Sequence, residues 1–102
     1  MAFERVPLKS LPWTPGAHPL ERKKTWPGRG LTLLELGPGF EDPNVCRNAH
    51  AIYVLEGTLA LDLGEGVVER VECGEACFLD RGTAHRARNA GSATLRLLVL
   101  SF

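Results

Sequence analysis

Short runs of apolar and β-branched residues alternate with glycine-containing turns from residue 31 onward, and this spacing constrains the fold more than any other feature. The runs cover residues 31–36, 50–56, 59–63, 67–72, 76–79, 84–89 and 93–102. No stretch repeats its apolar residues with the 3.6-residue period of an amphipathic helix. Short strands separated by glycine turns are typical of an all-β sandwich or barrel.

The first 30 residues differ in composition from the rest. The segment LPWTPGAHPLERKKTWPGRG, residues 11–30, is rich in proline, glycine and charge, which predicts an irregular arm that can include one short strand. A chain of 102 residues is long enough for one core and too short for two. We therefore expect an arm over residues 1–30 that packs on the barrel or on a dimer partner, and a barrel over residues 31–102. Trp13 and Trp26 are interpreted as anchors of this arm rather than as pocket walls.

The charge balance narrows the choice of partners. Twelve basic and twelve acidic side chains cancel, which argues against nucleic acid or an anionic membrane as the main partner. The sequence contains no apolar run of membrane-spanning length, and its first residues do not resemble a signal peptide. We expect a cytoplasmic protein whose three cysteines are reduced thiols.

Strand periodicity predicts which side chains face inward. Residues two apart in a strand point to the same side. In the run 84–89, His85, Ala87 and Asn89 share one face and two arginines share the other, so His85 is expected inside the barrel. In the run 50–56, His50 shares a face with Ile52 and Val54, and an earlier start of the strand would add Cys46 and Asn44. The two histidines can therefore converge although they are 35 positions apart.

Residues 74–89, GEACFLDRGTAHRARN, carry a recognisable spacing. Gly74, Gly82, His85 and Asn89 match the second motif of the cupins, a family of small jelly-roll β-barrels, and Asp80 stands in place of the motif's proline. The resemblance implies an all-β jelly-roll barrel with a binding site in its interior.

The run HAIYVLEG, residues 50–57, resembles the end of the first cupin motif. Counting back from Gly57 places His50 where the family has a glutamate, and Asn44 and Cys46 where it has two histidines. A register shifted by one residue would instead place Val45 and Arg47 at those positions, leaving only two histidines as ligands. Both alignments remain open at this point.

By this resemblance, Cys46, His50 and His85 would hold a divalent metal such as Zn, Ni, Fe or Mn. A thiolate and two imidazoles leave a fourth position open for a ligand. Asn44 is a poor ligand for soft metals and is better interpreted as a turn residue. The alternative is a metal-free barrel in which the histidines bind each other or a buried water. His18 is expected on an exposed loop rather than as a third imidazole.

Three functional hypotheses follow. The first is a metal-dependent protein that binds a small organic molecule in the barrel. The second is a metal-free domain that binds or senses a metabolite. The third is an enzyme without metal, with a histidine as acid or base or Cys46 as nucleophile. The residues expected to contact a small-molecule ligand are Asn44, Ile52, Val54, Leu61 and Phe78.

The last strand is apolar on both sides. Leu98 and Leu100 share a face with Arg96, while Leu95, Leu97 and Val99 share the opposite face. Burial of both faces would require a second layer outside the barrel. Together with the family resemblance, this pattern predicts a homodimer.

Overall fold

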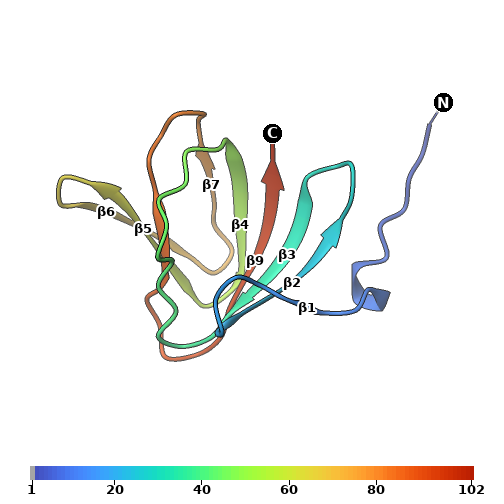
Figure 1. Ribbon diagram of the computed structural model, residues 1–102, viewed down its shortest axis with the longest axis horizontal. Coiled ribbons are helices and arrows are strands. Elements are labelled where there is room, and N and C mark those ends of the chain that lie inside the picture. Colours follow the sequence, from blue (N-terminus) through green and yellow to red (C-terminus); the bar gives the residue numbers. More distant parts are fainter. Residues whose placement is uncertain (1) are drawn as a thin grey trace.

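A computed structural model describes residues 2–102 as two antiparallel β-sheets that face each other (Figure 1). The elements are η1 (Leu8–Ser10), β1 (Thr14–Pro15), β2 (Glu21–Trp26), β3 (Leu31–Leu36), β4 (His50–Glu56), β5 (Thr58–Gly64), β6 (Val67–Glu72), β7 (Ala76–Leu79), β8 (Arg86–Asn89) and β9 (Leu95–Ser101). The larger sheet has the order β1-β2-β3-β9-β4-β7, and the smaller one has the order β6-β5-β8. This arrangement confirms the expected all-β jelly roll. Within residues 2–102, no helix has the length and apolar character needed to cross a membrane.

The arm is more regular than its composition predicted. It contains two strands, and all six residues of β2 pair with β3 in the larger sheet. The polar run of β2 has little strand preference of its own, so pairing with the apolar β3 decides its conformation. The division of the chain at residue 30 stays a prediction.

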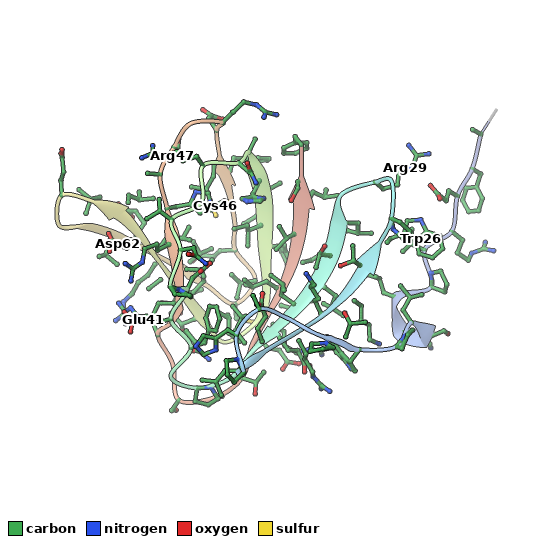
Figure 2. All side chains as sticks on the ribbon, in the orientation of Figure 1. Trp26, Arg29, Glu41, Cys46, Arg47 and Asp62 are labelled. Carbon is green, nitrogen blue, oxygen red and sulfur yellow. The ribbon has the colours of Figure 1, made fainter. Side chains whose placement is uncertain are left out.

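Both tryptophans of the arm hold it to the larger sheet. Lys24 is only 8% exposed, and its Nζ lies 4.8 Å from the centroid of the Trp13 ring while donating to a backbone oxygen of η1. Farther along, the carboxylate of Glu4 accepts hydrogen bonds from Trp26 Nε1 and Arg29 Nε (Figure 2). A cation over an aromatic face and charge-assisted hydrogen bonds thus anchor the arm.

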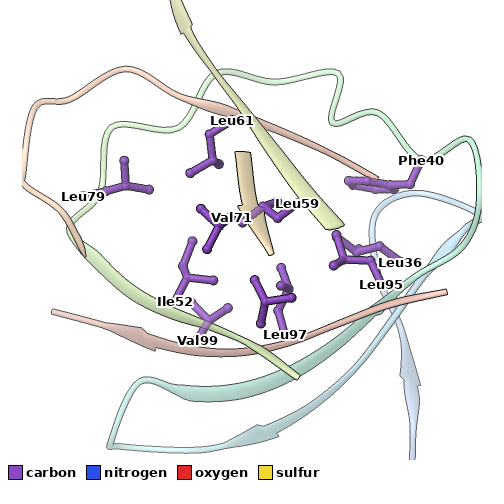
Figure 3. Close-up of a cluster of buried hydrophobic side chains, with 11 residues drawn as sticks. Leu36, Phe40, Ile52, Leu59, Leu61, Val71, Leu79, Leu95, Leu97 and Val99 are labelled. Atoms are coloured by element: carbon purple, nitrogen blue, oxygen red, sulfur yellow. The ribbon is translucent and has the colours of Figure 1, made fainter. Parts of the chain in front are cut away.

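The apolar core lies between the two sheets (Figure 3). Its members are Leu36, Phe40, Ile52, Val54, Leu59, Leu61, Val71, Leu79, Leu95, Leu97 and Val99. In β9, the inward residues are buried, while Leu98 is half-buried and Leu100 is exposed on the outer face. The strand periodicity predicted from the sequence is therefore confirmed in β9.

Asn89 is a structural residue at the end of β8. It is 5% exposed, and its Nδ2 donates to the carbonyl oxygens of Leu36 at 3.0 Å and Ala93 at 2.9 Å. Its Oδ1 accepts from the amide of Gly91 at 2.9 Å. A single amide side chain thus joins β8 to the end of β3 and to the turn before β9, which accounts for the asparagine at this position of the motif.

Gly57 forms the tight turn between β4 and β5. Its φ of 88° lies in the left-handed region, and a Cβ atom at this position would lie 3.1 Å from the Cα of Leu95. Both the backbone conformation and the close approach of β9 therefore require glycine here.

We expect Asn89→Ala to lower the free energy of unfolding by about 3 kcal/mol, because three hydrogen bonds are lost and buried backbone groups remain unpaired. Urea unfolding followed by circular dichroism measures this loss. Asn48→Ala, at an exposed asparagine, is the matched control and is expected to change stability by less than about 0.5 kcal/mol. Equal effects of the two substitutions would contradict a structural role for Asn89.

Candidate functional site

A cavity of about 140 Å³ lies between the two sheets. Its walls come from both sheets and from the segment after β3. The lining residues are Glu21, Leu34, Leu36, Phe40, Asp42, Cys46, His50, Ile52, Leu59, Leu61, His85, Ala87, Leu97 and Val99. The cavity is therefore a largely apolar space with a few polar groups, which is the usual character of a small-molecule site.

Two backbone hydrogen bonds place Cys46 opposite His85. The amide of Cys46 donates to the carbonyl of His85 at 2.8 Å, and the amide of His85 donates back at 2.9 Å. This isolated bridge and a second one between Glu41 and Arg88 hold the segment after β3 against β8. His50 approaches from the first residue of β4, and Figure 2 shows the sulfur of Cys46 directed toward that strand.

The donor atoms of Cys46, His50 and His85 form one group. All lie within 4.8 Å of one another, and Cys46 Sγ is 3.4 Å from His50 Nε2. Zn–S and Zn–N bond lengths in a tetrahedral site imply a sulfur–nitrogen separation of about 3.5 Å. The two imidazole rings meet edge to face, with centroids 5.3 Å apart. Cys46 and His50 therefore have the separation that a tetrahedral ion requires, and the donor atom of His85 lies within 4.8 Å of both.

Hydrogen bonds fix the orientation of both imidazoles. His85 Nδ1 is 2.9 Å from the carbonyl oxygen of Thr83, which can only accept, so Nδ1 carries the proton and Nε2 of the neutral ring has the lone pair. His50 Nδ1 is 3.0 Å from the hydroxyl oxygen of Ser101, leaving Nε2 directed at Cys46. Outer partners of this kind orient the histidine ligands of metal sites.

Burial lowers the pKa of His50 below its ordinary value, and the nearby His85 lowers it further. Removal of an imidazolium from water and its proximity to a second imidazole both disfavour the charged form. The neutral imidazole is the form that binds a metal.

The chemistry of the donor set fits a divalent metal. One thiolate and two neutral imidazoles suit Zn, and three protein ligands leave a fourth position for a ligand or water. The 2-His-1-carboxylate set typical of non-haem iron oxygenases is not the set found in this group.

Of the residues expected to contact a ligand, Ile52 and Leu61 line the cavity. Val54 is fully buried in the core but is not part of the cavity wall. Asn44 is exposed and outside the cavity wall, and its backbone amide donates to Asp42 Oδ1 at 2.9 Å.

Phe78 does not line the cavity, and this expectation was wrong. Its side chain is 77% exposed on the outer face of β7. The pairing of β7 with β4 sets Cys77 opposite the inward Ile52 and Phe78 opposite the outward Ala51. The four-residue run ACFL is apolar at every position, so it contains no alternation from which this orientation was readable.

Two carboxylates of the cavity wall escaped the sequence analysis. Glu21 begins β2, in the segment that we predicted to be an irregular arm, and Asp42 follows the turn after β3. The pairing of Glu21 with the inward-facing Leu36 brings it to the cavity. His18 packs edge to face on Phe40, with centroids 4.9 Å apart, and is not part of the Cys46, His50 and His85 group.

Comparison with known proteins identifies the fold. The family model described as the cupin domain matches residues 32–101. The polyketide cyclase RemF from Streptomyces resistomycificus is structurally similar, with a TM-score of 0.80 and 28% identity, over 98% of this chain and 79% of that chain. No curated protein matches the sequence significantly.

Two other similar structures belong to differently named proteins. The CENP-C cupin domain of Drosophila melanogaster has a TM-score of 0.75 and 16% identity, over 92% of this chain and 77% of that chain. KdgF from Halomonas sp. has a TM-score of 0.73 and 18% identity, over 91% of this chain and 89% of that chain. These two likenesses establish the fold and leave the function to the chemistry of the site.

We expect His85 and His18 to adopt opposite tautomers. His85 is protonated on Nδ1 because it faces a carbonyl oxygen, whereas His18 Nδ1 accepts the amide of Leu20 at 3.0 Å and leaves the proton on Nε2. Nitrogen-15 NMR of the metal-free protein at about pH 8.5, where an ordinary imidazole is neutral, distinguishes the two forms. An Nε2 proton on His85 would contradict the orientation described above.

Proposed function

The chain belongs to the cupin family, and we propose that it binds a small molecule in the barrel cavity at a divalent metal held by Cys46, His50 and His85. The observation that carries this proposal is the convergence of three donor atoms within 4.8 Å on the wall of a cavity. Zn is the preferred ion because a thiolate ligand favours it over Mn, while Ni and Fe are the other candidates.

When bound, such a metal supplies a Lewis acid that polarises an oxygen of the ligand. The protein's own residues provide the environment. Thr83 and Ser101 orient the two imidazoles, and leucines form much of the cavity wall. An apolar wall strengthens each polar contact to a ligand, because it lowers the local dielectric constant.

The similarity to RemF, which is described as a polyketide cyclase, supports a small organic molecule as the ligand. The free thiols of Cys46, Cys73 and Cys77 suit a reducing compartment, and we propose a cytoplasmic location on that ground.

A metal-free binding or sensing domain is the second candidate function. It is favoured by the contact between Cys46 Sγ and His50 Nε2, which pairs the two groups without an ion. The cavity would then hold its ligand through apolar contacts and hydrogen bonds to the same side chains.

We expect the full chain, purified without chelators and then reconstituted with Zn, to hold about one Zn per chain. Plasma mass spectrometry measures the ion content. His85→Ala and Cys46→Ser should each lower Zn affinity by at least about 100-fold, since a site with two ligands left is incomplete. His18→Ala is the matched control and should retain the metal, because His18 lies outside the group.

Less than about a tenth of an ion per chain after reconstitution with Zn, Ni, Fe and Mn would overturn the metal site and favour the metal-free domain. Retention of Zn by both ligand variants would show that any ion binds elsewhere. Melting temperatures of all variants, measured without metal, separate loss of a ligand from loss of the fold.

We also propose that two copies associate through the outer face of the larger sheet. Tyr53, Phe78 and Leu100 expose apolar surface there, around a shallow apolar depression that Leu98 helps to line. β7 is an edge strand of this sheet and therefore has one unpaired side. The formal net charge of zero removes general repulsion between copies, which makes a second copy a suitable occupant.

Phe78→Ser is expected to raise the dissociation constant of the dimer by at least about tenfold, because it removes the most exposed aromatic ring of this face. Sedimentation equilibrium measures the constant. Phe3→Ser, at an equally exposed phenylalanine of the arm, is the matched control and should leave it unchanged. A monomeric wild-type chain, or equal effects of both substitutions, would overturn the dimer.

A further inference from the structure

The cavity wall has acidic side chains and no basic lysine or arginine. Most of the wall is formed by aliphatic side chains and Phe40, and its polar members are Glu21, Asp42 and the Cys46, His50 and His85 group. No lysine or arginine is among the lining residues. The wall therefore offers no cationic group with which a ligand carboxylate or phosphate would pair.

The two carboxylates are not neutralised by neighbouring cations. Glu21 Oε1 accepts the amide of Ala17 at 3.1 Å, and Asp42 Oδ1 accepts the amide of Asn44 at 2.9 Å. In residues 2–102, neither carboxylate takes part in an ion pair. The two acidic side chains therefore lie at the wall of a mostly apolar space without a cationic partner.

The arginines of β8 do not neutralise the two carboxylates. Arg86 and Arg88 lie on the opposite face of β8 from His85 and Ala87, and they pair or bridge with Glu41 outside the cavity. A divalent ion and the Cys46 thiolate would together add one positive charge, which the two carboxylates outweigh. The site is therefore acidic with or without a metal.

The size of the cavity limits the ligand further. Its volume of about 140 Å³ is close to that of an engineered apolar cavity of about 150 Å³ that binds benzene. A compact ring or an aliphatic group of similar bulk fills such a space, whereas a larger molecule must extend outside it.

We infer that Glu21 and Asp42 make this cavity selective for a compact, largely apolar molecule that is neutral or cationic, and that they exclude anions of the same shape. This inference rests on the proposed function for the place of binding. It goes beyond that proposal by assigning the ligand class and the two residues that select it. A like charge without a compensating cation is an effective means of rejecting a wrong partner.

Benzamide, benzamidine and benzoate test this selection, because they share one shape and are neutral, cationic and anionic. NMR titrations of the full chain, metal-free and Zn-loaded, give the three dissociation constants, and shifts of the Ile52 methyl groups locate binding in the cavity. We expect benzoate to bind at least about tenfold more weakly than benzamide, equivalent to about 1.4 kcal/mol. Benzamidine should bind at least as tightly as benzamide.

Glu21→Gln and Asp42→Asn remove the charge while retaining the oxygen that accepts the backbone amide. The double variant should bind benzoate and benzamide with constants that agree within about threefold. Glu41→Gln is the matched control, because this carboxylate lies outside the cavity, and it should leave the ranking unchanged. The two single variants extend the test if the double variant melts at a lower temperature than the wild type.

Equal binding of benzoate and benzamide by the wild type would overturn the inference, as would an unchanged ranking in the charge variants. Failure of all three probes to bind would overturn the assigned ligand class. These outcomes are distinct from failure of the proposed metal site, because the metal content is measured separately and the ranking is also measured in metal-free protein.

Discussion

The reciprocal hydrogen bonds between the backbones of Cys46 and His85 are the contact on which the candidate site depends. They fix a long connecting segment against β8 and so turn a loop cysteine into a cavity residue. The larger sheet supplies the rest, since β4 brings His50 to the same end of the cavity and β9 brings Ser101 to its outer nitrogen. Main-chain pairing sets these positions independently of the side chains, which leaves the side chains free to form the site.

Much of the fold was predictable because it depends on local alternation. The glycine turns marked the strand ends, and the two arginines of β8 indicated which side of that strand faces water, which placed His85 inside. Phe78 and Glu21 were not predictable in this way. The orientation of Phe78 is set by the register of β7 on β4, and Glu21 reaches the cavity only because β2 pairs with β3. Both orientations depend on pairing between strands, which the alternation of residues within one strand does not reveal.

The site differs from the usual cupin ligand set in a chemically coherent way. In the alignment that counts back from Gly57, His50 stands where the family has a glutamate and Cys46 where it has a histidine. At the proposed metal site, a Cys46 thiolate would then supply the negative charge that the glutamate supplies in the family. Carboxylates are nevertheless present in the cavity wall as Glu21 and Asp42, apart from the group of Cys46, His50 and His85. In the proposed function, these carboxylates would act on the ligand rather than on the metal ion.

Strand β9 joins the inner and the outer surface of the molecule. Its inward residues line the core, its Ser101 contacts His50, and its outward leucines belong to the exposed apolar face. The core residues, Ser101 and the outward leucines all belong to β9. A displacement of this strand would therefore change both the cavity and the outer apolar face. If two copies associate through the outer face as proposed, any effect of ligand binding on that association must be matched by an equal effect of association on ligand binding. In so small a barrel, the same strand forms part of the cavity and part of the outer surface, so a change in one affects the other.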